Sequence, residues 1–138
     1  MSAGFATATP LLLAAAPVGA AVVAAALGRR APVSAARPGA WTAGAGFVAA
    51  AAWAVVSPDR LGAALLLLVF GVSAIAQGFA VRYLAGEPQA PWFSCGASLL
   101  TAASAVMVTA TTLVGLATGW TAAGVALCLL LGTYLQLP

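Results

Sequence analysis

The sequence predicts an all-α, polytopic membrane protein with about five transmembrane helices. Of its 138 residues, 64% are hydrophobic and only 5% are charged, whereas about a quarter of the residues in soluble proteins are charged. The charged residues also divide the chain into charge-free runs long enough to cross the ~30 Å hydrocarbon core of a bilayer. The run after Glu87 would span roughly 76 Å as one helix, so it must fold back as two spans.

We therefore expect a single transmembrane helical domain over residues 1–138, embedded in the lipid bilayer of the cell (inner or plasma) membrane. The expected spans cover about 10–28, 39–57, 61–81, 92–110 and 113–134.

The first expected span, 10–28, contains Pro17, which should kink it. A cleaved signal peptide is the competing interpretation, but it needs positive charge before the apolar region. Here Arg29 and Arg30 follow that region. We therefore expect this helix to be retained in the mature protein.

The loop from Arg29 to Arg37 predicts the orientation of the chain. It carries three of the five arginines and accounts for the net charge of +3. Because cytoplasmic loops of membrane proteins are enriched in Lys and Arg, we expect this loop in the cytoplasm and the N-terminus outside. Membrane orientation explains the basic charge, so we expect no nucleic-acid partner.

The second and third spans are joined by a tight turn at Pro58-Asp59-Arg60. In the third, small residues fall on one face at Gly71, Ala74 and Gly78, which lets another helix approach closely. Gln77 is an amide inside this span, and we interpret it as an interhelical hydrogen bond in preference to a transport role.

We expect a second cytoplasmic loop from Arg82 to Pro91, with Arg82, Tyr83 and Glu87 as its candidate polar positions. The span that follows it carries a weakly polar stripe, which we expect to face protein. Its members are Ser94, Ser98, Thr101 and Thr109.

In the last span, Trp120 lies near mid-membrane, away from the interfaces where Trp is enriched, so we expect it to pack against another helix or subunit. The candidate helix-core positions are Trp120, Thr121, Gly124 and Cys128.

The side chains exclude most catalytic chemistry. The chain has no His, and Cys95 and Cys128 lie far apart, so we expect no metal site and no cofactor. We find no Ser/His/Asp set, carboxylate pair or phosphate-binding loop, so we expect no enzyme. A small multidrug exporter would need a carboxylate inside a span, which is absent here.

Two runs of residues point to a family. Phe79-Ala-Val-Arg-Tyr-Leu84, then Gly86-Glu-Pro88 and Trp92-Phe93, resembles a signature of antiporter-like membrane subunits. These are subunit L (chain 5) of NADH-quinone oxidoreductase and the Mrp-type cation/proton antiporters. In the last span, the matching positions are Trp120, Gly124, Leu129, Leu130, Gly132 and Tyr134. The resemblance covers about 59–134.

The departures from this family favour one branch. After the tryptophan, proton-pumping members carry a membrane glutamate, whereas this chain has Thr121, whose hydroxyl cannot carry a titratable charge at physiological pH. Lack of that glutamate is similar to the branch that serves inorganic-carbon accumulation. Trp120, Leu127, Leu130 and Leu131 fit that branch, while Gly124 replaces its serine and Cys128 its histidine.

The resemblance implies a truncated or split, proton-conducting antiporter-like subunit that contributes transmembrane framework to a proton- or cation-translocating complex. Its relatives have about a dozen or more helices, so the expected partners are other membrane subunits. The alternative is a small integral membrane scaffold or assembly protein without transport activity. Under either hypothesis we expect no catalytic residue.

Overall fold

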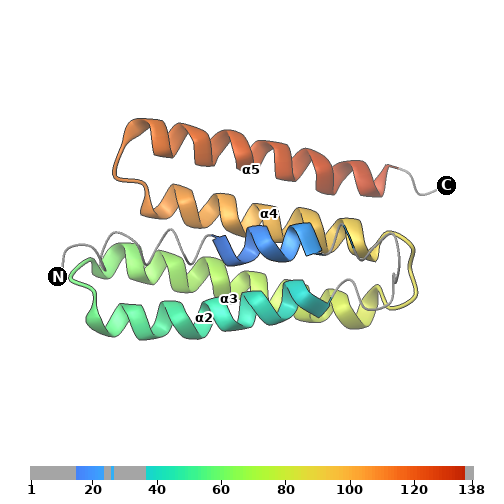
Figure 1. Cartoon of the computed structure of the whole chain (residues 1–138), viewed down its shortest axis with the longest axis horizontal. Helices are drawn as coiled ribbons and strands as arrows, with labels where there is room; N and C mark the ends of the chain where they lie inside the picture. The colour runs from blue at the N-terminus through green and yellow to red at the C-terminus, as the bar shows by residue number, and fades with distance from the viewer. Residues whose placement is uncertain (1–14, 24–25, 27–36, 136–138) are drawn as a thin grey trace.

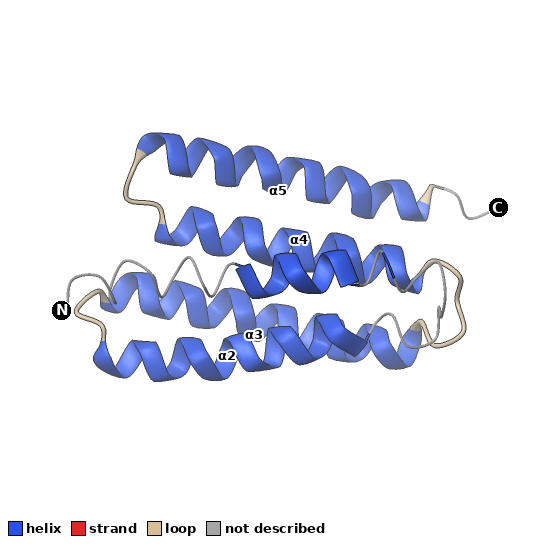
Figure 2. Cartoon of the chain, in the orientation of Figure 1, coloured by secondary structure: helices blue, strands red, loops and turns tan. Residues whose placement is uncertain are grey.

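A computed structural model describes residues 15–23, 26 and 37–135 of the chain, in which every regular element is a helix (Figure 2). The long helices are α2 (Arg37–Val56), α3 (Arg60–Tyr83), α4 (Ala90–Thr109) and α5 (Leu113–Tyr134). All four are long and apolar enough to cross a membrane. The prediction of an all-α polytopic protein is confirmed, and the ends of these four helices agree with the expected spans within two residues.

The expected first span lies mostly outside the described residues. Its described part, 15–23, is helical, and Pro17 within it is fully buried.

The four long helices run antiparallel to their neighbours along the chain and form an elongated bundle (Figure 1). α2 packs on α3, α3 on α4, and α4 on α5, while α5 contacts α4 alone among these helices. Consequently α4 lies near the middle of the bundle and α5 at its edge. The connection 84–89 lies at the same end as the start of α2, and the connections 57–59 and 110–112 lie at the opposite end.

Side-chain caps define where two of the helices begin. Asp59 accepts a hydrogen bond from the backbone N–H of Gly62 at 3.0 Å, and Thr112 accepts one from Gly115 at 3.1 Å. The first N–H groups of a helix have no backbone acceptor within the helix, and leaving them unpaired is costly inside a membrane. These side chains supply the missing acceptors. The tight turn predicted at 58–60 is present as a three-residue connection at 57–59, because Arg60 is already the first residue of α3.

The loop predicted at Arg82–Pro91 is shorter than expected. Two of its three candidate loop residues were therefore placed in the wrong element. Arg82 and Tyr83 belong to the last turn of α3, and of the three only Glu87 lies in the connection. A basic side chain is favourable at a helix C-terminus, and the Tyr83 ring stacks on Phe79 one turn earlier, with 5.9 Å between ring centroids. Gly86, with a φ of +94°, allows the turn that follows.

The core of the bundle is small and depends on close approach of α2 and α3. Ala50, Leu66, Phe70 and Ala105 form its fully buried centre. The Phe70 ring lies directly against Gly46, where a Cβ atom would overlap it. Because lipid is as apolar as these side chains, packing density rather than escape from water must hold the helices together.

We predict that Gly46→Ala lowers the melting temperature of the protein in detergent micelles, because the added methyl group collides with the Phe70 ring. Overpacking of this kind costs about 1–3 kcal/mol. Gly44→Ala is the matched control on the same helix, since a Cβ atom there meets nothing within 4 Å. Equal melting temperatures for the two variants, measured by circular dichroism, would contradict the packing described here.

Candidate functional site

A buried polar cluster between α3 and α4 is the principal concentration of hydrogen-bonding side chains within the described helices. It contains Ser73 and Gln77 of α3 and Ser94, Ser98 and Thr101 of α4. Gln77, Ser94, Ser98 and Thr101 are each at most 5% exposed. The prediction that the polar stripe of α4 faces protein is confirmed for its three members in this cluster.

The hydrogen bonds of the cluster form a chain with one direction. Ser98 Oγ donates to Gln77 Oε1 at 3.4 Å, and Gln77 Nε2 donates to Ser73 Oγ at 3.0 Å. Thr101 Oγ1 donates its one hydrogen to the carbonyl of Ala97 at 2.8 Å. It must therefore accept in the 2.6 Å hydrogen bond with Ser73 Oγ, which makes Ser73 the donor.

The chain of donors crosses from α4 to α3 and back, so the interpretation of Gln77 as an interhelical hydrogen bond is confirmed. Serine, threonine and glutamine side chains do not titrate near neutral pH. The cluster can therefore orient helices or bind a polar group, but it does not hold a charge.

Helix α2 closes this cluster through a glycine. A Cβ atom at Gly39 would lie 2.6 Å from Ser94 Oγ and 3.1 Å from Ser98 Oγ, and would overlap Gln77 Oε1. Only a residue without a side chain allows α2 to approach this closely. Sequence reasoning missed the role of Gly39. Its place directly after Arg37-Pro38 indicated only the start of a span.

Ser94 is the exception in the cluster. Its Oγ atom is fully enclosed and has no hydrogen-bond partner among the described residues. Burying a hydroxyl without a partner costs about 1–3 kcal/mol. It faces the same three-helix junction as Gln77.

The four candidate positions on α5 do not lie in a helix core of the described structure. Trp120 is 72% exposed, and Thr121 and Cys128 are also exposed. A Cβ atom at Gly124 would meet nothing within 4 Å. The four residues fall within about 100° of one another around α5, which we name the outer side of α5.

The opposite side of α5 makes the contact with α4. Ala126 is 1% exposed, and a Cβ atom at Gly119 would lie 3.1 Å from the backbone of Met107. A Cβ atom at Gly96 of α4 would likewise lie 2.9 Å from the Leu130 side chain. The outer side of α5 is therefore turned away from the rest of the described bundle, except at Thr121, which borders the groove between α4 and α5.

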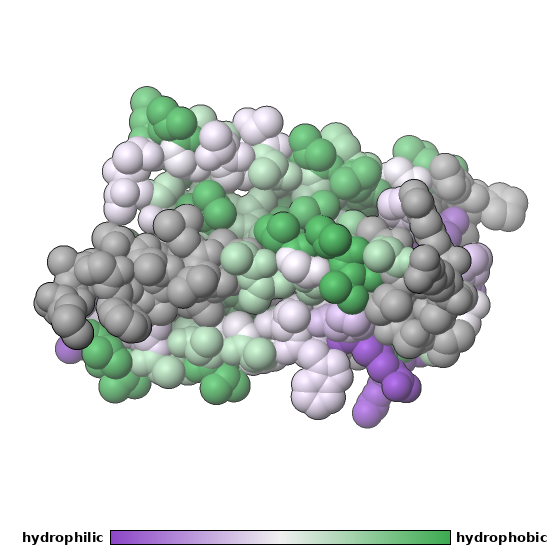
Figure 3. Space-filling model, viewed as in Figure 1, coloured by the Kyte–Doolittle hydropathy of each residue, from purple (hydrophilic) through white to green (hydrophobic). Residues whose placement is uncertain are grey.

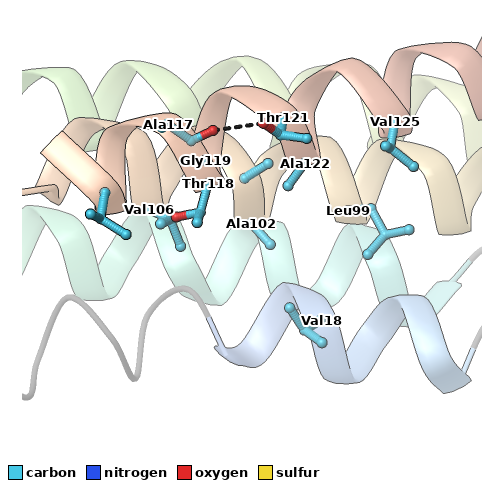
Figure 4. A pocket seen from close by; sticks show the side chains of 12 residues that line it. Val18, Leu99, Ala102, Val106, Ala117, Thr118, Gly119, Thr121, Ala122 and Val125 are labelled. Atoms are coloured by element: carbon cyan, nitrogen blue, oxygen red, sulfur yellow. Dashed lines mark hydrogen bonds between the residues drawn. The ribbon is translucent and has the colours of Figure 1, made fainter.

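A groove of about 770 Å³ runs between α4 and α5, and Val18 from the segment 15–23 contributes to its lining (Figure 4). Its walls are almost entirely apolar, with Thr118 and Thr121 as the polar side chains. Thr121 Oγ1 donates to the carbonyl of Ala117 in its own helix at 2.8 Å, so its hydrogen is already used. Thr118 does the same toward Gly115 at 2.9 Å.

A smaller crevice of about 400 Å³ lies between α3 and α4 and reaches Leu130 of α5. Ser73, Gln77, Thr101 and Ser104 form its polar lining. No group of three or more His, Cys, Asp or Glu residues that could hold a metal ion occurs within the described ranges.

The charged side chains of the described region all lie at helix ends. Arg37 and Arg60 are the first residues of their helices, Arg82 lies in a last turn, and Asp59 and Glu87 lie in connections. All five are exposed. No carboxylate therefore lies inside a span of the described part of the chain.

Comparison with known proteins gives a partial match. The chain is 36% identical over 80 residues to the probable inorganic carbon transporter subunit DabB1 of Halothiobacillus neapolitanus. The match covers 58% of this chain but only 14% of that subunit. No protein-family model and no solved structure matches the chain.

The match and the four apolar helices together support a multi-pass membrane protein that is similar to part of a transporter subunit. The similarity agrees with the resemblance noted in the sequence to antiporter-like subunits of inorganic-carbon uptake.

The polar cluster generates one prediction about helix association. Thr101→Val keeps the shape of the side chain but removes the hydroxyl that accepts from Ser73, so it should lower the stability of the bundle in micelles by about 1 kcal/mol. Thr121→Val is the matched control, because its hydroxyl bonds only to its own helix. If thermal unfolding shows the same loss of stability for both variants, the cluster does not contribute to the association of α3 with α4.

A second prediction contrasts two serines one helical turn apart on α4. Ser94→Ala should leave the melting temperature unchanged or raise it, because the mutation removes a buried hydroxyl that has no described partner. Ser98→Ala should lower it, because Gln77 Oε1 then loses its donor. A larger loss from Ser94→Ala than from Ser98→Ala would mean that Ser94 has a partner that its surroundings hide.

Proposed function

We propose that this chain supplies non-catalytic transmembrane framework to an antiporter-like membrane subunit of the kind that serves inorganic-carbon uptake. The observation that carries the proposal is the 80-residue match to the probable inorganic carbon transporter subunit of Halothiobacillus neapolitanus. Because the matched segment covers only 14% of that subunit, we assign the transport activity to the assembly rather than to this chain.

The distribution of charge supports a framework role. Proton transfer through a membrane uses titratable side chains held inside the bilayer. The described spans have their charged groups only at their ends, and the polar cluster contains neutral groups alone. Thr121, at the place where the resemblance would put a glutamate, uses its hydroxyl within its own helix. These features fit packing better than ion movement.

The outer side of α5 is the proposed contact with the other membrane helices of the complex. Trp120 is large and 72% exposed, and Gly124 beside it leaves open space. Such a combination would let a neighbouring helix pack closely beside an indole ring, since small residues allow helix backbones to approach. Thr121 and Cys128 would lie at the edges of that contact.

The proposal also includes the orientation. Arg37 and Arg82 lie at one end of the bundle, together with the connection that contains Glu87, and Arg60 lies with Asp59 at the other. The positive-inside tendency favours the first end in the cytoplasm of the cell.

The test is co-assembly with a relative that lacks the matching part. We would express the tagged chain together with the Halothiobacillus subunit from which the shared 80-residue segment has been removed. We expect the chain to co-purify with the shortened subunit and to restore inorganic-carbon uptake. Trp120→Ala should reduce co-purification severalfold, because it removes the largest side chain of the proposed contact.

Trp92→Ala is the matched control, since Trp92 is also exposed but lies at the start of α4. Absence of co-purification, under conditions where the complete Halothiobacillus subunit assembles, would contradict the framework proposal. It would favour an independent membrane scaffold instead.

A further inference from the structure

The end of the bundle formed by the start of α2 and the last turn of α3 gathers exposed basic and aromatic side chains. Arg37 is the first residue of α2, and Trp41, 78% exposed, follows one turn later on the same face. Arg82 lies in the last turn of α3 beside Tyr83, which is 77% exposed. Hydrophilic side chains gather at this end of the space-filling view, whereas hydrophobic ones cover much of the length (Figure 3).

Arg37 and Arg82 lie at nearly the same height along the bundle. Gly39 of α2 is level with Gln77 of α3, because a Cβ atom at Gly39 would overlap the Gln77 amide. At about 1.5 Å per residue, Arg37 lies about 3 Å beyond Gly39, and Arg82 about 7.5 Å beyond Gln77, toward the same end. The difference of about 4.5 Å is less than the length of an arginine side chain.

The two arginines also share one flank of the α2–α3 pair. A Cβ atom at Gly71 would lie 3.3 Å from Phe47, so these residues mark that flank. Arg82 follows Gly71 by close to three turns and lies within about 20° of it around α3. Arg37 lies about 80° from Phe47 around α2, farther toward the outside. Neighbouring helices pack about 8–10 Å apart, so the two arginines lie on adjacent helices, on one flank and at one end of the bundle.

We propose that this Arg37–Arg82 flank binds the headgroup of an anionic phospholipid in the leaflet that surrounds it. The positive charge of the two arginines is complementary to the negative charge of this headgroup. Guanidinium groups form paired hydrogen bonds with phosphate oxygens, and Trp and Tyr rings favour the headgroup level of a bilayer. Glu87 is the acidic side chain of the described region at this end, and it lies in the connection rather than on the flank.

The acyl chains of such a lipid would lie along the exposed apolar side chains below the arginines. Phe79 is 69% exposed and Ile75 is 76% exposed, and both precede Arg82 on the outer part of α3. Trp41 and Val48, the latter 68% exposed, continue the surface on α2. The phosphate of a bound lipid would therefore contact the basic groups, and its acyl chains would contact the apolar side chains below them. A free phosphate ion would contact only the basic groups.

The test uses the full chain in detergent, with phosphatidylglycerol added stepwise and the bound lipid counted by native mass spectrometry. We expect phosphatidylglycerol to bind more tightly than phosphatidylcholine. Arg37→Gln and Arg82→Gln should each weaken phosphatidylglycerol binding about fivefold, the contribution typical of one basic side chain near anionic lipid. Arg60→Gln, which removes an exposed arginine at the opposite end, should leave binding unchanged.

Three results would overturn the proposal. Equal binding of phosphatidylcholine would show that the apolar surface alone holds lipid. Equal weakening by Arg60→Gln would show a general effect of net charge. Displacement of the lipid by millimolar glycerol phosphate would assign the flank to soluble phosphates. Because the phosphatidylglycerol preference of the unmodified chain is measured first, the proposal remains testable even where a variant fails to fold.

Discussion

The close approach of α2 to the Gln77 amide at Gly39 is the constraint on which the rest of the bundle depends. Inside a bilayer, apolar side chains gain little by leaving lipid for protein, so helices associate through tight packing and hydrogen bonds. Gly39 supplies the first, and the chain of donors from Ser98 through Gln77 and Ser73 to Thr101 supplies the second. Gly46 repeats the close approach against the Phe70 ring, two turns farther along α2. The two glycines fix the register of α2 on α3, and the hydrogen bonds fix that of α3 on α4.

The same physics explains why α5 is attached differently. Gly119 against Met107 and Gly96 against Leu130 give α5 two close contacts with α4. Thr118 and Thr121 bond to their own helix instead, which is a common way to satisfy a hydroxyl in an apolar environment. These two threonines therefore do not join α5 to α4, and most of the outer side of α5 remains available to lipid or to another helix.

Hydropathy and charge spacing were sufficient to predict the four long helices, because a membrane span must satisfy its own backbone hydrogen bonds and exclude charge. The ends were less predictable: Arg82 extends α3, since a long basic side chain can reach the headgroup region from inside a helix. The polar stripe of α4 was predictable from periodicity. The placement of Trp120 was not, because lipid-facing and protein-facing positions on a helix are equally apolar, and periodicity cannot distinguish them. Gly39 and the unpartnered Ser94 required three helices in place before their proximity could be seen.

The separation of charge from the interior has a consequence for how such a protein can take part in transport. Five exposed charged residues lie at the helix ends or in the connections between the described helices, while the neutral cluster around Gln77 holds three of these helices in register. Neither set places a titratable group where an ion would have to cross. In the framework role proposed above, coupling to ion movement would act through the packing of these helices against others, and the exposed, charge-free outer side of α5 is the proposed surface for that packing. A framework of the proposed kind would influence a transporter by holding neighbouring helices in place, so substitutions in it should alter assembly of the complex before they alter which species is transported.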